Sequence, residues 1–234
     1  TGGAADTVGL EPEWWAHCAA HEGVLLQGPT LQVGFKAEFR AHTARLGLYF
    51  GNLLPSQPLT LTTCTVASAA ADRLLLSTAP PPATLPPRGQ ALQMMQVELL
   101  GPFDNPPVLQ LAFLDPASGR PTALSLPLPL LPLRFLKPMP LTAEEYFRWW
   151  RAPGLQERQA NFQFRGAYDA PAVRRTLSDG LRLAMLDGID PLPTNICAAA
   201  GLCLQSGVLP PAPAATYCLL RLEVNPTFAR TPAD

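Results

Sequence analysis

Hydrophobic and polar residues alternate along the first half of the chain with the two-residue period of β-strands. In residues 31–39 the apolar side chains fall at Leu31, Val33, Phe35 and Phe39, on one side of an extended backbone. Similar stretches follow at regular intervals with turn residues between them, which is typical of an antiparallel sandwich. The pattern predicts strands within residues 23–40, 44–52, 59–68, 72–79, 90–100, 107–115 and 122–130.

The pattern changes near Arg134, after which helical periods replace the alternation. A helix is predicted over residues 142–154, because Thr142 and Glu145 have the spacing of a capping box and a Pro-Gly pair ends the stretch. Further helices are predicted over residues 155–164 and 171–188, and further strands over residues 195–205 and 215–225.

These elements predict a mainly β protein with an α+β part, divided near residues 134–138. We expect a linker over residues 1–16, a β-sandwich over residues 17–134 and a smaller α+β unit over residues 135–234. In the last sandwich strand, Pro127 and Pro129 fall on one face, which predicts a position at the edge of a sheet.

The amino-acid composition indicates many loops and excludes several classes of function. Proline accounts for 28 of the 234 residues, and the Pro-rich stretch at residues 79–87 is interpreted as a loop, or as a polyproline ligand for aromatic grooves. The net charge of −1 gives no nucleic-acid footprint. The charge is −3 over residues 1–133 and +2 over residues 134–234, a weak bias toward acidic peptides in the second half.

The cysteines and histidines give no sign of a disulfide framework, a metal or a catalytic centre. Five irregularly spaced cysteines indicate reduced thiols. His17, Cys18 and His21 are the one cluster with metal-ligand types, and they lack a second pair of ligands. The chain has no phosphate loop, dinucleotide fingerprint or nucleophile elbow, so we predict neither cofactor nor enzyme. An unrecognised hydrolase would have to use His42 or Cys64.

Eight stretches match one known family in the same order along residues 18–225. They are GVLLQGPTLQVGFKAEFR, LYFGN, PPVLQLAF, RFLKP, EEYFRWW, QERQANF, DGIDPLPTN and CLLRLEVN. Through them the chain resembles the C-terminal appendage, or ear, of alpha-adaptin in the plasma-membrane clathrin adaptor complex. The resemblance implies an immunoglobulin-like β-sandwich followed by a small α+β platform, an antiparallel sheet with helices.

The resemblance also implies a function without catalysis. Such an appendage binds short linear motifs of endocytic accessory proteins, and it joins the other adaptor subunits through its parent chain. It lies in the cytoplasm at plasma-membrane clathrin-coated pits and vesicles, and its membrane association is indirect, through the coat. The alternatives are an appendage of a beta-adaptin or coatomer subunit, and a scaffold with a degenerate peptide site.

The platform is expected to bind Asp-Pro-Phe, Asp-Pro-Trp and Phe-x-Asp-x-Phe peptides. Three residues apart on one helix, Phe147 and Trp150 share a face, and Arg221 and Glu223 point the same way from a strand. Aromatic rings beside a guanidinium suit a peptide that combines an aromatic residue with a carboxylate. By resemblance the site comprises Tyr146, Phe147, Trp150, Glu157, Arg221 and Glu223.

Each of these residues also has a purely structural interpretation. Phe147 and Trp150 could be core residues of an amphipathic helix, and Arg221 with Glu223 a surface ion pair. Adjacent residues point in different directions, so we expect one of Trp149 and Trp150 to be buried and the other exposed. Glu157 would then lie on a solvated helix face.

The sandwich is expected to carry a second site, for Trp-x-x-Phe peptides. The resemblance places it at Lys36, Tyr49, Gly51 and Gln90, where an aromatic ring and a glycine leave an open groove and polar side chains meet the peptide backbone. The alternative is an ordinary polar face of the sandwich. Because the family continues beyond CLLRLE into another strand and a helix, we expect the platform to be truncated at its C-terminal end.

Overall fold

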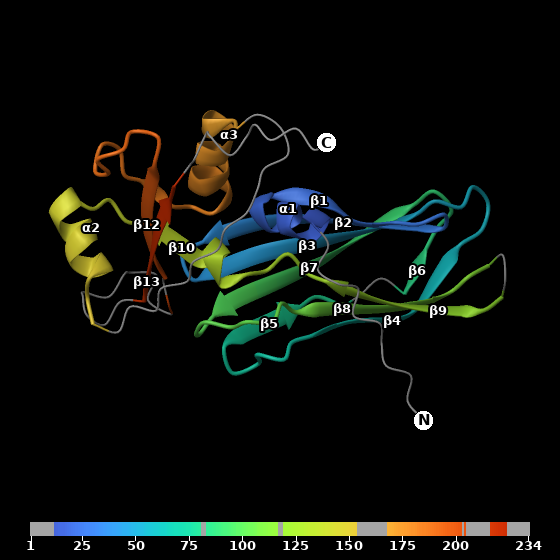
Figure 1. Cartoon of the computed structure of the whole chain (residues 1–234). Coiled ribbons are helices and arrows are strands. Elements are labelled where there is room, and N and C mark those ends of the chain that lie inside the picture. Colours follow the sequence, from blue (N-terminus) through green and yellow to red (C-terminus); the bar gives the residue numbers. More distant parts are fainter. Residues whose placement is uncertain are drawn as a thin grey trace, which may run out of the picture. The chain divides into compact units, whose positions relative to one another are not determined.

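The structure is a computed structural model, and it describes residues 12–80, 83–116, 119–153, 168–202, 204 and 216–223. Two compact units divide between Phe135 and Leu136 (Figure 1). The first is a β-sandwich and the second an α+β unit, which confirms the predicted fold class.

Two antiparallel sheets make up the first unit, in the orders β1-β2-β3-β7-β5 and β6-β4-β8-β9. The predicted strand stretch over residues 23–40 is two strands, because Gly28, Pro29 and Thr30 turn the chain and the Gly28 N–H donates to the Leu31 carbonyl at 3.0 Å. The strands are β1 (Glu22–Gln27), β2 (Leu31–Arg40), β3 (Thr43–Asn52), β4 (Leu59–Ala67), β5 (Leu74–Thr78), β6 (Thr84–Leu85), β7 (Gln90–Leu99), β8 (Val108–Leu114) and β9 (Pro121–Pro127).

The core of the sandwich lies between the two sheets. Burial alternates along β2 as the sequence pattern predicts, with odd-numbered residues inside. Strand β9 lies at a sheet edge, which confirms the prediction from its prolines. Core side chains that are at most 2% exposed include Val33, Phe35, Leu46, Leu48, Phe50, Leu109 and Leu111.

Helix α1 (Pro12–Ala19) overlaps the stretch that the sequence analysis assigned to a linker. Trp14 and Cys18, four residues apart on one helical face, are 6% and 2% exposed. The indole Nε1 of Trp14 donates to the Pro127 carbonyl at 3.1 Å. Burial of this face against the sandwich stabilises a helix whose pattern is too short to identify from sequence.

The Pro-rich loop is fixed to the sandwich by one buried amide. Asn52 is 2% exposed, and its Nδ2 lies within hydrogen-bond distance of the carbonyls of Gln57, Leu85 and Pro86 at 2.8, 3.1 and 3.1 Å. Its Oδ1 accepts from the Leu54 N–H at 3.0 Å. The described part of the loop is therefore an anchored structural element.

The sandwich ends in a short 3-10 helix, η1 (Pro132–Phe135), with a buried cation. Arg134 is 1% exposed, and its guanidinium lies 4.5 Å from the centre of the Phe39 ring. Phe39 and Phe135 meet edge to face, with 5.3 Å between ring centres. Arg134 and Phe135 thus close one part of the sandwich core.

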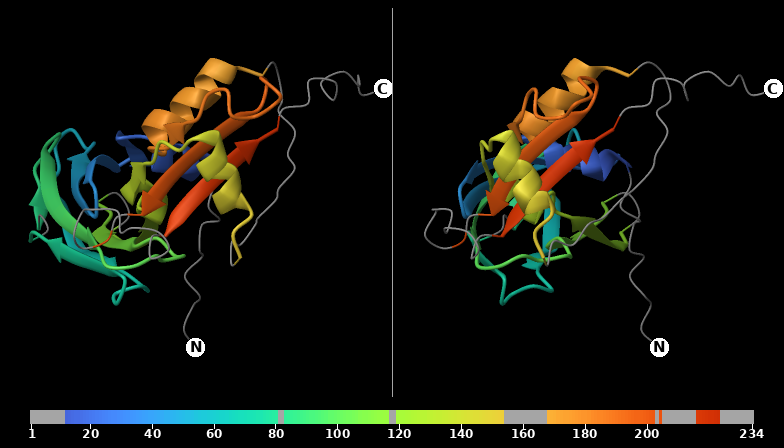
Figure 2. Two further views of the ribbon diagram at one scale, coloured as in Figure 1. Left: turned by 90° about the vertical axis from the view of Figure 1, so that its left-hand side faces the viewer. Right: turned by 60° about the vertical axis from the view of Figure 1, so that its left-hand side comes forward.

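The second unit is a small antiparallel sheet with helices (Figure 2). Strand β12 pairs with all three other strands and is buried along its whole length. Its run of alanines and glycine leaves room for side chains packed on it. The elements are β10 (Leu136–Pro138), α2 (Ala143–Trp150), α3 (Ala170–Arg175), the π-helical turn η2 (Thr176–Gly180), β11 (Ala184–Met185), β12 (Ile196–Leu202) and β13 (Tyr217–Leu222).

The helix predicted over residues 171–188 is wrong beyond Gly180. The chain leaves the helix there, and Ala184 and Met185 pair with β12 as strand β11. Backbone pairing and the burial of Leu183 and Leu186 outweigh the helical period of the sequence. The helix predicted over residues 155–164 lies outside the described residues.

Candidate functional site

Helix α2 is held at its start by the predicted capping box. The Glu145 N–H donates to Thr142 Oγ1 at 3.3 Å, and the Thr142 N–H donates to Glu145 Oε2 at 2.8 Å. The bond from the Thr142 backbone is the main reason that the pKa of Glu145 is lowered. This cap fixes the residue at which the helix begins, and with it the position of the aromatic residues one turn later.

Tyr146 anchors α2 to the sheet and has no exposed surface. Its hydroxyl donates to the Leu220 carbonyl at 2.8 Å, and its ring packs with Cys197 and Ala199. Burial raises its pKa. The expectation that Tyr146 contacts a peptide is therefore wrong. Its ring is completely buried, so it can only support the side chains that pack on it.

Phe147 and Trp150 flank the Tyr146 ring, and both are partly buried. Phe147 meets Tyr146 edge to face with 5.3 Å between ring centres, while Trp150 stacks on it at 5.6 Å. Both residues therefore keep part of their surface open to solvent. Phe147 and Trp150 are thus neither fully buried nor fully exposed. They combine the two interpretations given by the sequence, one as core residues and one as peptide-binding residues.

The expected division between the two adjacent tryptophans is not found. Trp149 and Trp150 are both partly buried, because each indole packs against another aromatic ring. Trp149 lies against Tyr217 of β13, with 4.7 Å between ring centres. Trp149 therefore helps to attach the helix to β13.

Arg221 lies on the same face of the sheet as the aromatic residues of α2. It is directly opposite Cys197 in the β12–β13 pair, and Cys197 belongs to the cluster on which Tyr146 packs. Residues opposite each other in neighbouring strands point to the same side of a sheet. The structure therefore brings Phe147, Trp150 and Arg221 to one face of the second unit.

The guanidinium of Arg221 is engaged by two carboxylates. Its Nε donates to Asp190 Oδ2 at 2.7 Å, and its Nη1 forms an ion pair with Glu223. The Arg221 side chain is 33% exposed, compared with 64% for Glu223 and 3% for Asp190. One acidic partner is thus fixed in the interior, and the other is at the surface.

Sequence reasoning missed Asp190, which is the central acceptor of this network. Its Oδ1 accepts from the Leu192 N–H at 2.9 Å and from Asn195 Nδ2 at 3.1 Å. The hydrogen bond from Arg221 is the largest of the effects that lower the pKa of Asp190, and the same bond raises the pKa of Arg221. An Asp that begins a Pro-containing turn is a known signal for such bonding, and DGIDPLPTN contains it.

Sequence reasoning also missed two arginines, Arg148 in α2 and Arg151 at its C-cap. Both are exposed, and with Ala143, Glu144 and Phe147 they line a shallow hollow. They add positive charge beside an aromatic ring. Glu157, which the resemblance assigns to the same region, lies outside the described residues.

The four residues expected to form the sandwich site share the outer face of one sheet. Tyr49 is opposite Gly34 in β2 and Leu92 in β7, and Gly51 is opposite Gln90 in β7. Lys36 points outward from β2 and lies 3.8 Å from the Glu22 carboxylate. Three neighbouring strands therefore present Lys36, Tyr49, Gly51 and Gln90 on one face.

Gly47 and Leu92 complete this outer face, and neither was singled out from the sequence. A Cβ atom on Gly47 would lie 3.1 Å from Leu92 Cδ1 and 3.4 Å from the Tyr49 ring. Glycine thus permits the two larger side chains to lie over the strand. Leu92 is 47% exposed, so an apolar strip next to Tyr49 is open to solvent.

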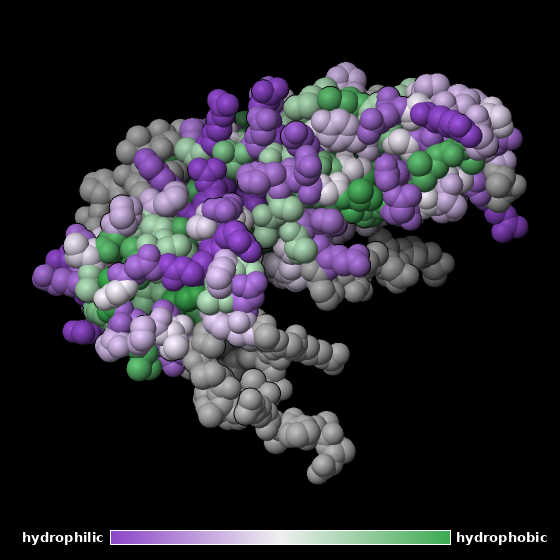
Figure 3. Space-filling view, turned by 90° about the horizontal axis from the view of Figure 1, so that it is seen from above, coloured by the Kyte–Doolittle hydropathy of each residue, from purple (hydrophilic) through white to green (hydrophobic). Residues whose placement is uncertain are grey.

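Exposed hydrophobic residues in the described part of the chain are spread over several elements. In the face seen in Figure 3, they form small groups among hydrophilic residues. Such scattered residues are normal for a protein surface. The exposed large hydrophobic residues are Trp15, Val24, Leu53, Leu75, Leu92, Leu114, Leu133 and Leu192.

Cys64 and His42, the two residues considered for a hydrolase, have other side chains of the sandwich as neighbours. Cys64 donates to Gln93 Oε1 at 3.4 Å, and burial raises its pKa to about 11. His42 Nε2 lies 3.8 Å from Glu98 Oε1. Within the described ranges, no three His, Cys, Asp or Glu side chains are grouped to hold a metal ion, and no helix has the length and apolarity to cross a membrane.

Comparison with known families identifies the chain. A family model described as "Adaptin C-terminal domain" matches residues 21–129, and one described as "Alpha adaptin AP2, C-terminal domain" matches residues 134–230. The chain belongs to the alpha-adaptin appendage family. The second match favours alpha over the beta-adaptin and coatomer alternatives for this appendage.

Curated relatives extend over both units of the appendage. It is 31% identical to "AP-2 complex subunit alpha-2" of Dictyostelium discoideum over 211 residues, which are 89% of this chain and 20% of that protein. It is 33% identical to "AP-2 complex subunit alpha-1" of Arabidopsis thaliana over 212 residues, 90% of this chain and 20% of that protein. The chain therefore spans about a fifth of the length of these relatives.

Among solved structures, one alignment covers an entire smaller domain. The "yeast GGA1_GAE domain-P21" structure aligns with a TM-score of 0.37 and 21% identity, over 47% of this chain and 99% of that one. That score is too low to establish a shared fold.

Proposed function

We propose that this chain is the appendage of an AP-2-type clathrin adaptor and that its second unit captures endocytic accessory proteins. The ligands are short peptides of the Asp-Pro-Phe, Asp-Pro-Trp and Phe-x-Asp-x-Phe kinds. One observation carries the proposal: Phe147 and Trp150 present partly open rings on the face that also holds Arg221. Membership of the alpha-adaptin appendage family supports it.

Each part of such a peptide has a matching group on this face. The aromatic ring of the peptide packs against Phe147 and Trp150, and complete burial of such a ring contributes about 1.5–3 kcal/mol. The peptide carboxylate takes the Nη1 donor of Arg221, after Glu223 moves away into solvent. Asp190 stays in place and keeps the guanidinium oriented toward the peptide.

The proposed setting is a cytoplasmic coat at plasma-membrane clathrin-coated pits and vesicles. The appendage joins the other adaptor subunits through its parent chain, and reaches the membrane only through the coat. Interfaces this small are individually weak and gain strength when many copies act together. The function is binding without catalysis, and it contributes to endocytosis and vesicle-mediated protein transport.

Isothermal titration calorimetry with an Asp-Pro-Phe peptide tests the platform site. Trp150→Ala and Arg221→Ala are expected to abolish measurable binding while the circular dichroism spectrum is kept. The matched controls are Leu192→Ala and Arg175→Ala, which remove an exposed apolar and an exposed basic side chain from the same unit. Equal binding by Trp150→Ala and Leu192→Ala would remove the basis of the proposal.

A second measurement tests the competition for Arg221. Glu223→Gln removes the exposed carboxylate that pairs with Nη1, so the peptide carboxylate no longer displaces a charge. We expect the affinity for the Asp-Pro-Phe peptide to rise by a few-fold, about 1 kcal/mol or less, as befits an exposed ion pair. A fall in affinity would show that Glu223 itself contacts the peptide.

The outer face of the sandwich is proposed as a second site, for Trp-x-x-Phe peptides. Tyr49 and Leu92 offer apolar surface beside Gly51, while Lys36 and Gln90 offer donors to peptide carbonyls. Tyr49→Ser should weaken a Trp-x-x-Phe peptide and leave an Asp-Pro-Phe peptide unaffected. Loss of both peptides in this variant would contradict two separate sites.

A further inference from the structure

The open side of the sandwich, between the edge strands β1 and β9, is occupied near one end by helix α1. Within the described residues, β1 pairs only with β2, and β9 pairs only with β8. Helix α1 bridges the two edges: a Cβ on Gly23 of β1 would lie 2.7 Å from the His17 ring, and Trp14 donates to Pro127 at the end of β9. A buried indole thus fills this end of the gap.

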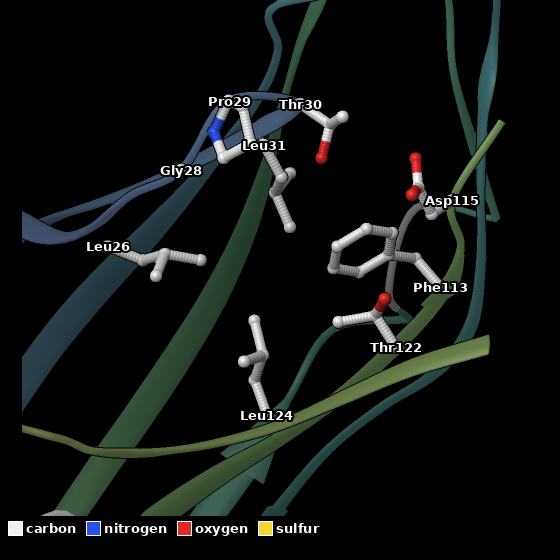
Figure 4. A pocket seen from close by; sticks show the side chains of 9 residues that line it. All are labelled: Leu26, Gly28, Pro29, Thr30, Leu31, Phe113, Asp115, Thr122 and Leu124. Carbon is white, nitrogen blue, oxygen red and sulfur yellow. The ribbon is translucent and has the colours of Figure 1, made fainter. Parts of the chain in front are cut away.

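The other end of the same side is a half-open hollow of about 230 Å³ (Figure 4). Leu26 and Leu31 come from the β1–β2 hairpin, and Phe113 and Leu124 come from β8 and β9. Their side chains converge on the space from both sheets. Apolar walls of this kind give ordered water few partners.

Polar groups in the hollow lie together on one side. The oxygen-bearing side chains of Thr30, Asp115 and Thr122 surround the Phe113 ring, opposite Leu26. The hydroxyls of Thr30 and Thr122 can each accept a hydrogen bond. The hollow therefore combines an apolar floor with acceptors along one rim.

We propose that this hollow binds a tryptophan side chain of an extended partner peptide that lies along the open side of the sandwich. Its volume is below the roughly 300–1,000 Å³ of small-molecule pockets, so one large side chain fits it better than a whole metabolite. The rim oxygens suit the indole N–H. Trp14 shows that this gap accepts an indole with its N–H bonded to the sandwich.

The edges beside the hollow favour a peptide in strand conformation. Edge strands carry backbone groups without a strand partner, and an extended peptide satisfies them by strand addition. Thr122 and Leu124 of β9 point into the hollow, while Ala123 between them is exposed. A tryptophan entering between the sheets would thus be flanked by backbone pairing. This site lies inside the sandwich, whereas Tyr49 lies on its outer face.

Methyl NMR of the 234-residue chain with labelled leucines tests this proposal directly, with N-acetyl-tryptophanamide as the probe. We expect saturable shifts at Leu26, Leu31 and Leu124, and none with N-acetyl-alaninamide. Leu75 and Leu133 are exposed, do not line the hollow and serve as internal controls. Absence of saturation, or equal shifts at these controls, would overturn the proposal.

Two variants on β9 distinguish the effect of filling the hollow from the effect of changing the exposed surface. Thr122→Phe places a ring in the hollow and should reduce the affinity for the probe about tenfold or more. Ala123→Phe adds the same ring on the exposed side and should leave the affinity unchanged. Equal effects would overturn the proposal, and if Thr122→Phe does not fold, the wild-type methyl map decides.

The alternative occupant of the hollow is Trp15 of a second copy of this chain, because this side chain is 52% exposed. Sedimentation of the wild-type chain and of Trp15→Ala distinguishes the two. A monomer with probe-dependent shifts supports the peptide proposal. A dimer that Trp15→Ala dissociates, with matching changes at Leu26 and Leu124, would replace it by self-association. Neither result depends on Phe147, Trp150 or Arg221, so the platform proposal is tested separately.

Discussion

Arg221 donates from Nε to Oδ2 of the buried Asp190 at 2.7 Å, and this bond fixes the cation on the face that carries the aromatic rings. Asp190→Asn keeps an acceptor for the Leu192 N–H but removes the charge that orients Arg221. We expect this variant to bind an Asp-Pro-Phe peptide more weakly, with a lower free energy of unfolding. Calorimetry and urea denaturation measure the two effects, and unchanged values in both would contradict a positioning role.

The same bond predicts how stability depends on pH. Because the pKa of Asp190 is lowered in the folded state below its ordinary value of 3.8, its stabilising effect is complete above that value. The effect is lost as the pH falls through the lowered folded-state pKa. The difference in unfolding free energy between wild type and Asp190→Asn should therefore be constant from pH 5 to 7 and shrink below about pH 4. A difference that grows in acid would have the wrong sign.

Tyr146→Phe tests how α2 is attached to the sheet. The variant keeps the buried ring but removes the hydroxyl that donates to the Leu220 carbonyl, which leaves that acceptor without this bond. We expect the free energy of unfolding to fall by about 1–2 kcal/mol in urea denaturation. Tyr217→Phe is the matched control, because Tyr217 is only partly buried and its ring packing on Trp149 is kept. Equal losses in both variants would argue against a specific role for the Tyr146 hydroxyl.

Thr142→Ala tests the start of the helix that presents Phe147 and Trp150. Loss of the capping side chain should cost about 1 kcal/mol of stability. Thr142→Ser keeps a hydroxyl at the cap and should stay close to wild type. Thermal unfolding followed by circular dichroism compares the two variants, and a full loss in Thr142→Ser would show that the methyl group matters more than the cap.

The buried thiols should be unreactive until the fold opens. Burial raises the pKa of Cys18 to about 12 and that of Cys64 to about 11, so neither forms appreciable thiolate near pH 8. We expect both to resist iodoacetamide in the native protein and to react in urea. Peptide mapping by mass spectrometry assigns the label to each cysteine. Rapid labelling of Cys64 in the native state would contradict its burial between the sheets.

The alternation in β2 identified the sandwich because each strand buries one face, and a period of two is a strong local signal. The capping box likewise located the start of α2. The strand after Gly180 was missed, since pairing with β12 is a long-range effect that a helical period in residues 171–188 does not reveal. Helix α1 was missed because its burial depends on the distant Pro127.

The candidate site was predicted in part for the same reasons. Spacing on a helix brings Phe147 and Trp150 together, and the strand pattern turns Arg221 to one side. The burial of Tyr146 and the bond between Arg221 and Asp190, which are 31 residues apart, depend on how α2 and β13 pack on β12. Local sequence carries no signal for that packing.

The central claim is that the carboxylate of a bound peptide meets Arg221 beside Trp150, and a double-mutant cycle between protein and peptide tests it most directly. Calorimetry compares wild type and Arg221→Lys with an Asp-Pro-Phe peptide and its Asn-Pro-Phe counterpart. A direct contact predicts a coupling free energy of about 0.5 kcal/mol or more. Purely additive losses would show that the carboxylate does not meet Arg221 and would contradict the proposed site.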